Sequence, residues 1–198
     1  MKLSANLEEN IRQAHAFLPI AKSFDIVTRD LCLGEAKGYW IGINGFLRVE
    51  ILQQIFSDLQ NPIYMQNMKI EDIKKYMEAK IGYVQASLSD DWDDILRNLT
   101  SGPSVLLIDG FAQAILLDVR TYPARSITEP DAEKVTKGAR DGFVETLLFN
   151  ANLIRRRIRS PRLTFELLSV GSESKTDVAV AYLDQAANPE LLGHLKET

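Results

Sequence analysis

The chain has 198 residues, of which 45% are apolar and 25% charged, and its net charge is −4. These values are typical of a folded globular protein with one domain or two small ones. No apolar run approaches the ~20 residues that span a bilayer, and no N-terminal secretory signal pattern is present. The single cysteine, Cys32, excludes an internal disulfide framework and a multi-cysteine metal site, and it fits a reducing compartment.

The first 122 residues predict an α/β subdomain. Apolar residues at helical spacing and segments of strand-like alternation follow one another, separated by glycine- and proline-containing loops. In chain order we expect a helix at 6–18, strands at 23–33 and 39–44, helices at 49–59 and 69–81, a strand at 83–88, a helix between 90 and 102, and two strands within 104–119. The last two strands are almost continuously apolar, which predicts that both faces of their sheet are covered. Asp109-Gly110 between them predicts a tight hairpin turn.

Residues 123–137 are interpreted as a linker and the start of a helical region, since Pro123 and Pro130 interrupt regular structure. A central helix is then predicted within 138–162. Its apolar residues recur at steps of three and four, which places them on one stripe; they are Val144, Leu147, Leu148, Ala151, Ile154 and Ile158.

Arginines crowd the end of this central helix. Arg155, Arg156, Arg157 and Arg159 lie in its last turns, and Arg140 lies near its start. One interpretation is a solvated face whose charge complements the helix dipole. The other is an interaction site for an acidic partner, such as another subunit, a lipid headgroup or a nucleic acid. Between Arg120 and Arg162 the chain carries +5 and elsewhere −9, so an acidic part of the same chain or of a neighbouring copy is also a candidate.

The remaining residues predict strands at 163–170 and 176–183 and a helix at 189–196. Together with the central helix they repeat the helix–hairpin–helix order of the first unit. We therefore expect two small related α/β (α+β) subdomains, each a mixed β-sheet with packed helices, with 138–198 forming a partial and truncated second subdomain. The alternative is coincidence, because helix–hairpin–helix order is common. An incomplete sheet would leave an open edge that tends to recruit another chain.

Signals for catalysis or for a cofactor are weak. The two histidines, His15 and His194, lie near the termini without a nucleophile pattern around them. The segment 171–176 ends in Lys-Thr like a phosphate loop, but it lacks the second glycine and precedes a strand. The aspartates at 90–94 are explained by helix capping, without calcium-loop spacing. We expect no enzyme activity, no cofactor and no metal.

Several separated motifs resemble the spore germination GerA/GerKA A-subunit family. They are Ser89-Asp90-Asp91-Trp92 followed by Ile95-Leu96, Gly102 with Val105 to Gly110, Thr128-Glu129-Pro130, Lys137 to Glu145, Asn152 to Arg159, and Gly171 with Ser174-Lys175-Thr176. Ala139 and Asp141 stand where the family usually has proline and glutamate. The pattern covers nearly the whole chain in order.

The resemblance implies an N-terminal domain of a membrane protein of the spore inner membrane, on the cytoplasmic side. In that family the domain precedes membrane helices, and the A subunit acts with B and C subunits in nutrient sensing. It therefore implies a non-enzymatic role in receptor assembly and nutrient signal transduction, with possible self-association. A relative encoded with the SpoVA proteins has the same domain, so the paralogue stays open.

Two further functions are considered. One is a small-molecule sensor with a ligand in the cleft between the subdomains, near residues 120–130. The other is nucleic-acid binding, which the acidic net charge and the lack of interleaved aromatic residues disfavour.

Overall fold

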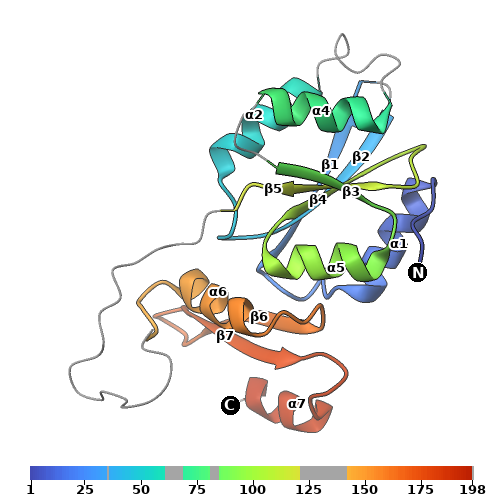
Figure 1. Ribbon diagram of the computed structural model, residues 1–198. Helices are drawn as coiled ribbons and strands as arrows, with labels where there is room; N and C mark the ends of the chain where they lie inside the picture. Colours follow the sequence, from blue (N-terminus) through green and yellow to red (C-terminus); the bar gives the residue numbers. More distant parts are fainter. Residues whose placement is uncertain (35, 61–68, 81–84, 121–141, 198) are drawn as a thin grey trace, which may run out of the picture.

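The computed structural model describes residues 1–34, 36–60, 69–80, 85–120 and 142–197 (Figure 1). We call residues 1–120 the first lobe and residues 142–197 the second lobe. In chain order the elements are α1 (Leu7–Phe17), β1 (Ile26–Leu33), β2 (Ala36–Ile43), α2 (Val49–Leu59), α4 (Ile70–Lys80), β3 (Gln85–Ser89), α5 (Trp92–Ser101), β4 (Ser104–Ile108), β5 (Ala114–Asp118), α6 (Leu147–Arg157), β6 (Leu163–Val170), β7 (Thr176–Leu183) and α7 (Pro189–Glu197).

The described strands of the first lobe form one sheet with the order β1-β2-β4-β5-β3. Every neighbouring pair is antiparallel, with Ile26 opposite Ile43 in β1–β2 and Tyr39 opposite Leu107 in β2–β4. The α/β (α+β) class is confirmed, but the prediction of mixed sheets is wrong. Short loops join β1 to β2 and β4 to β5, and a chain that turns back through a short loop can only pair antiparallel.

Helices cover both faces of this sheet (Figure 1). Helices α2 and α4 lie on one face and helices α1 and α5 on the other. Successive residues of β2 point to opposite faces of the sheet. Trp40 packs against Phe56 of α2, whereas Ile41 belongs to the apolar cluster on the face that α1 and α5 cover. All five residues of β4 and the first four of β5 are buried, which confirms that both faces of these two strands are covered.

The connection between β4 and β5 is longer than the predicted two-residue turn. It spans residues 109–113, with Gly110 at a φ of 85°. Asp109 and Gly110 form a hydrogen-bonded turn, in which Phe111 N–H donates to the carbonyl of Ile108 at 3.2 Å. Neighbouring segments also hold the loop, since Asp109 N–H donates to the carbonyl of Lys37 and Gly110 N–H donates to the carbonyl of Ala5.

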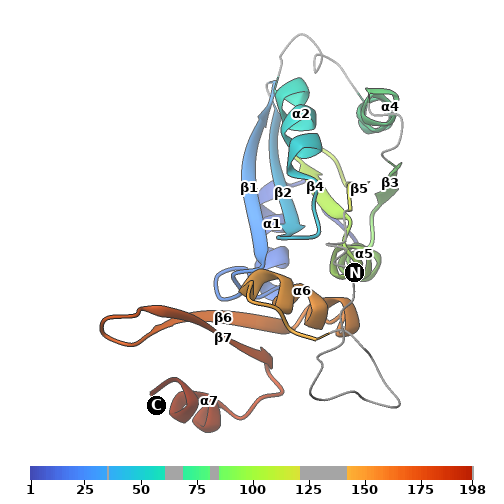
Figure 2. The ribbon, with the colours of Figure 1, turned by 90° about the vertical axis from the view of Figure 1, so that its left-hand side faces the viewer.

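The second lobe is a two-stranded ribbon between two helices. Strands β6 and β7 pair antiparallel over eight residues, from Leu163 opposite Leu183 to Val170 opposite Thr176. Helix α6 lies on one face of the ribbon and α7 on the other (Figure 2). Within the described residues, its buried apolar cluster consists of Ala151, Leu163 and Phe165, and Phe24 of the first lobe packs against them. The described part of the second lobe therefore has little core of its own.

The helix–hairpin–helix order predicted for both lobes is present. In the first lobe α1 and α2 lie on opposite faces of β1–β2, and in the second lobe α6 and α7 lie on opposite faces of β6–β7 (Figures 1 and 2). That the two hairpins superpose stays a prediction. The segment 123–137, predicted as a linker and the start of a helical region, lies outside the described residues.

The central helix begins later than predicted. Helix α6 starts at Leu147, after Thr146 in an extended conformation, so Val144 precedes the helix. The Asn150 side chain explains this start: its Nδ2 donates to the carbonyl of Val144 at 2.6 Å, and its Oδ1 accepts from Val144 N–H at 2.7 Å. These bonds hold the chain before the helix in a turn.

Candidate functional site: a buried arginine joint between the lobes

Helix α6 lies between the first lobe and the β6–β7 ribbon in both views (Figures 1 and 2). One side of the helix, with Ala151 and Ile154, packs on the ribbon. The adjacent stripe, with Asn152 and Arg155, is buried. Residues three or four apart share a helix face, so these positions form one continuous buried surface. The helix is thus one of the elements through which the lobes meet.

Arg155 makes the main polar contact between the lobes. Its Nε donates to Oδ2 of Asp25 at 2.8 Å and its Nη2 donates to Oδ1 at 3.0 Å, which is a two-pronged ion pair. Both side chains have 0% exposure. Burial lowers the pKa of Arg155, and the charge and hydrogen bonds of Asp25 oppose that change. A buried pair of this kind costs desolvation and is tolerated only when its remaining hydrogen-bonding groups are satisfied.

Two backbone carbonyl groups of the second lobe accept further hydrogen bonds from the guanidinium. Nη1 donates to the carbonyl of Ser160 at 3.1 Å, and Nη2 donates to the carbonyl of Leu163 at 2.9 Å. The guanidinium also lies over the Phe165 ring, 5.1 Å from its centroid. Arg155 therefore fixes the turn between α6 and β6 while it binds the first lobe.

A second set of hydrogen bonds joins residues 23–25, which precede β1, with strand β6. Ser23 Oγ donates to Asp25 Oδ1 at 2.6 Å and accepts from Phe165 N–H at 2.9 Å. Phe24 N–H donates to the Phe165 carbonyl at 3.0 Å, and the two phenyl rings meet edge to face. We call Ser23, Phe24, Asp25, Arg155 and Phe165 the inter-lobe joint.

Asn152 adds a close steric contact to the same interface. Its side chain lies so near the Gly45 turn that a Cβ on Gly45 would come within 2.0 Å of Nδ2. Gly45 also has a φ of 83°, a left-handed conformation that glycine adopts readily. Within the described part of the chain neither polar atom of the buried Asn152 amide has a hydrogen-bond partner. The contact is tight in shape but poor in polar complementarity.

The predicted interaction residues that the structure describes differ in their exposure. Arg155 is inside the protein, and its partner is Asp25 of the same chain. Arg156, Arg157 and Arg159 are exposed at the end of α6 and just after it, where an external partner can reach them, and Arg140 lies outside the described residues. Sequence reasoning missed Asp25, since nothing near it indicates a partner 130 residues away. The position of Arg155 four residues after the buried Ala151 was a usable signal.

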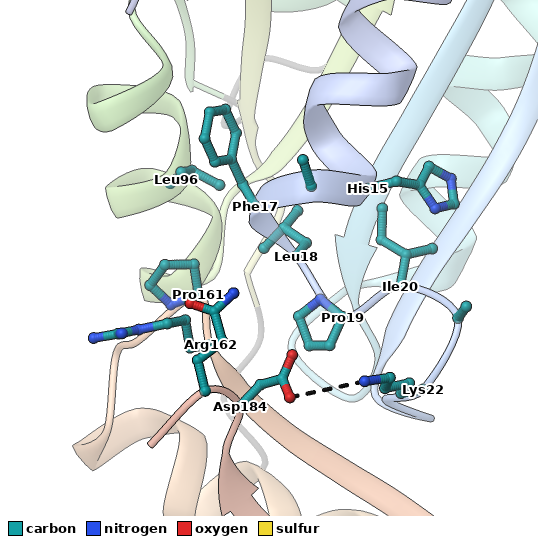
Figure 3. Close-up of a pocket in the computed structure, with 13 residues that line it drawn as sticks. His15, Phe17, Leu18, Pro19, Ile20, Lys22, Leu96, Pro161, Arg162 and Asp184 are labelled. Carbon is teal, nitrogen blue, oxygen red and sulfur yellow. Dashed lines mark ion pairs between the residues drawn. The ribbon is translucent and has the colours of Figure 1, made fainter. Parts of the chain in front are cut away.

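A pocket of about 500 Å³ lies beside this joint, between the lobes (Figure 3). The end of α1 with the loop after it, Leu96 of α5, and the segments 161–162 and 184–185 line it. Lys22 of the first lobe and Asp184 of the second face each other across it at 3.8 Å. The sequence placed such a cleft near residues 120–130, whereas the described lining comes from other segments.

The part of the chain that the structure describes contains no group of three or more metal-ligating side chains. No described helix combines the length and the apolar character that a membrane crossing requires.

Comparison with known proteins identifies the family. The model of the family described as Bacillus/Clostridium GerA spore germination protein matches residues 17–198. The chain belongs to the GerA spore germination protein family. The buried joint lies within the matched residues.

Two relatives in Bacillus subtilis (strain 168) illustrate the family. Stage V sporulation protein AF is 32% identical over 172 residues, which cover 86% of this chain and 34% of that protein. The membrane protein YfkQ is 27% identical over 197 residues, which cover 98% of this chain and 37% of that protein. The chain thus spans about a third of the length of these GerA-family relatives.

A solved structure shares the fold. The crystal structure of the N-terminal domain of the A subunit of the Bacillus megaterium spore germinant receptor GerK3 matches with a TM-score of 0.76 at 23% identity, covering all of this chain and 72% of that one. The two-lobed α+β arrangement is therefore a fold that this GerA-family chain shares with a receptor domain.

Proposed function

We propose that this chain is the N-terminal domain of a germinant receptor A-type subunit, and that it works without enzymatic chemistry in receptor assembly and nutrient signal transduction. It would act at the spore inner membrane, on the cytoplasmic side, with B- and C-type subunits and with further copies of itself. Family membership, the shared fold and the name of the membrane protein YfkQ support this proposal.

The observation that carries the mechanism is the ion pair between Asp25 and Arg155. Both groups are wholly buried and bind from different lobes, so the lobes cannot shift without breaking a desolvated ion pair. A rigid joint passes a displacement of one lobe to the other. The domain would thereby link events on its two lobes as one body.

The test is nutrient-triggered germination of spores that carry Asp25→Asn in the full-length protein, followed by the loss of optical density. We expect slower germination at an unchanged receptor level, measured by immunoblotting. Asp30→Asn, an exposed position on β1, is the matched control and should germinate normally. Normal germination of the Asp25→Asn spores would refute the coupling role.

A second candidate function, small-molecule sensing, is favoured by the pocket between the lobes. A ligand that contacts both lobes would stabilise their association and raise the melting temperature. Thermal-shift measurements against amino acids, sugars and nucleotides test this function, with Arg162→Ala at the pocket wall as the comparison. A shift that is the same in wild type and variant would place the ligand elsewhere.

A further inference from the structure

The outward face of α6 combines arginines with exposed apolar side chains. Phe149, Leu153 and Arg156 follow one another at steps of four and three residues, so they share one stripe, with Arg157 beside it. Phe149 is 43% exposed and Ile158, just after the helix, is 42% exposed. The first lobe and the ribbon occupy the other sides of α6, so this stripe is the one that faces away from the body of the protein.

The charges of this face are nearly all of one sign. Arg156, Arg157 and Arg159 are exposed within four positions, while Glu145 is the only acidic residue in 142–162. The chain as a whole is acidic, at −4. The described stretch 142–162 is therefore basic within an acidic chain, and its exposed arginines would orient the molecule toward an acidic surface.

We propose that this face, made of Phe149, Arg156, Arg157, Ile158 and Arg159, docks on the anionic headgroups of a membrane. Arginines attract acidic lipids, and the phenyl ring and the isoleucine side chain can enter the boundary between headgroups and acyl chains. Apolar side chains among the arginines favour a lipid surface over an acidic protein patch, which would not require them. The inference rests on the proposed function, because it needs a membrane beside the domain.

Vesicle co-sedimentation of the 198-residue chain tests the docking. Vesicles of phosphatidylcholine with ~30% phosphatidylglycerol are compared with vesicles of pure phosphatidylcholine, at low salt and at ~150 mM salt. Each arginine near an anionic surface contributes about a fivefold change in partitioning. Arg156→Glu with Arg157→Glu should therefore weaken binding by about 25-fold or more. Phe149→Ser should weaken binding at both salt concentrations, because its contribution is apolar.

The matched control is Arg12→Glu with Arg29→Glu, which changes the net charge by the same amount at exposed sites on α1 and β1. It should bind like the wild type, and circular dichroism should show the same helix content in all variants. Equal loss in both double variants, or no wild-type binding to anionic vesicles, would overturn the proposal. Concentration-dependent self-association without vesicle binding would also overturn it and would assign the face to a second copy. Germination assays stay independent of these outcomes, so failure of the docking is distinguishable from failure of the proposed function.

Discussion

At the scale of single residues, Arg155 differs from its neighbouring arginines because it is buried. Its partner Asp25 lies on the other lobe and shares its complete burial. Removal of one member of such a pair leaves an unpaired charge in the interior, whereas removal of both leaves none. The stability of the joint is therefore expected to be strongly non-additive.

A double-mutant cycle tests this expectation. Arg155→Met should lower the free energy of unfolding by about 3–5 kcal/mol, because the Asp25 carboxylate would be left buried and unpaired. Asp25→Leu combined with Arg155→Met should be less destabilised than the sum of the single variants. Urea denaturation of the four proteins measures the coupling. Additive losses would contradict the role of the pair as the main polar contact between the lobes.

Gly45 permits a residue-scale test of the same interface. Gly45→Ala introduces left-handed strain of about 1–2 kcal/mol and also a collision with the Asn152 amide. Gly110→Ala is a matched control, since Gly110 has a similar φ of 85° but a methyl group there would meet nothing within 4 Å. We expect Gly45→Ala to lower the free energy of unfolding more than Gly110→Ala does. Adding Asn152→Ala to Gly45→Ala should recover only the part of that loss that exceeds the effect of Gly110→Ala. Equal effects of the two glycine substitutions in denaturation would argue against close contact at α6.

At the scale of elements, a polar cluster attaches α7 to the ribbon. Glu166 of β6 pairs with Lys196 of α7 and accepts a hydrogen bond from the Tyr182 hydroxyl of β7. Lys196 and Tyr182 together hold the pKa of Glu166 below its ordinary value of 4.5. Burial and the nearby carboxylate raise the pKa of Tyr182, so its hydroxyl keeps the proton that it donates. The apolar residues Leu191 and Leu195 of α7 are mostly exposed and add little to its attachment.

The pH dependence of this attachment follows from the sign of the shift. A carboxylate with a lowered folded-state pKa stabilises the structure above its unfolded-state value, and the stabilisation is lost as the pH falls through the folded-state pKa. Amide hydrogen exchange of α7 should therefore accelerate below about pH 4.5 relative to that of β4. In the Glu166→Gln variant, the amides of α7 should exchange faster than in the wild type at neutral pH, and their exchange should lose this pH dependence. Unchanged exchange in α7 of the variant would contradict the assignment.

The sequence predicted most elements because their signals are local. The bounds of α2, β6 and β7 agree with the predicted ranges, since apolar spacing and turn residues fix them. The start of α6 was wrong because a side-chain bond from Asn150 back to Val144 competes with the helix, and periodicity does not report such bonds. The order of strands in the sheet was not predicted, because β2 and β4 pair across intervening helices.

The candidate site was predicted only in part, for the same reason. The cluster of arginines on the central helix is a local feature, and it directed attention to α6. The burial of Arg155 depends on Asp25, Ser160 and Leu163, and the first of these lies far away along the chain. The spacing of residues along the chain does not reveal long-range ion pairs. From one sequence, the buried arginine differs from its exposed neighbours only in its position on the apolar stripe of the helix.

At the scale of the whole molecule, the two lobes differ in the size of their buried apolar cores. The first lobe has two large clusters of buried apolar residues, one on each face of its sheet. The described second lobe has three buried apolar residues, and Phe24 of the first lobe packs against them. Small units with little buried surface are hard to stabilise alone. The first lobe is therefore expected to act as the template on which the second lobe orders.

Separated lobes test this dependence. A chain of residues 1–120 should unfold cooperatively on heating, because both of its apolar clusters are intact, and its Asp25 carboxylate would be hydrated. A chain of residues 142–197 should give a poorly dispersed NMR spectrum alone and a dispersed one when the first lobe is added in excess. Arg155→Ala in the shorter chain should abolish this induced folding, while Arg159→Ala, an exposed control, should preserve it. A cooperative thermal transition of residues 142–197 alone would show that the second lobe has a sufficient core, and the joint would then serve positioning instead of folding.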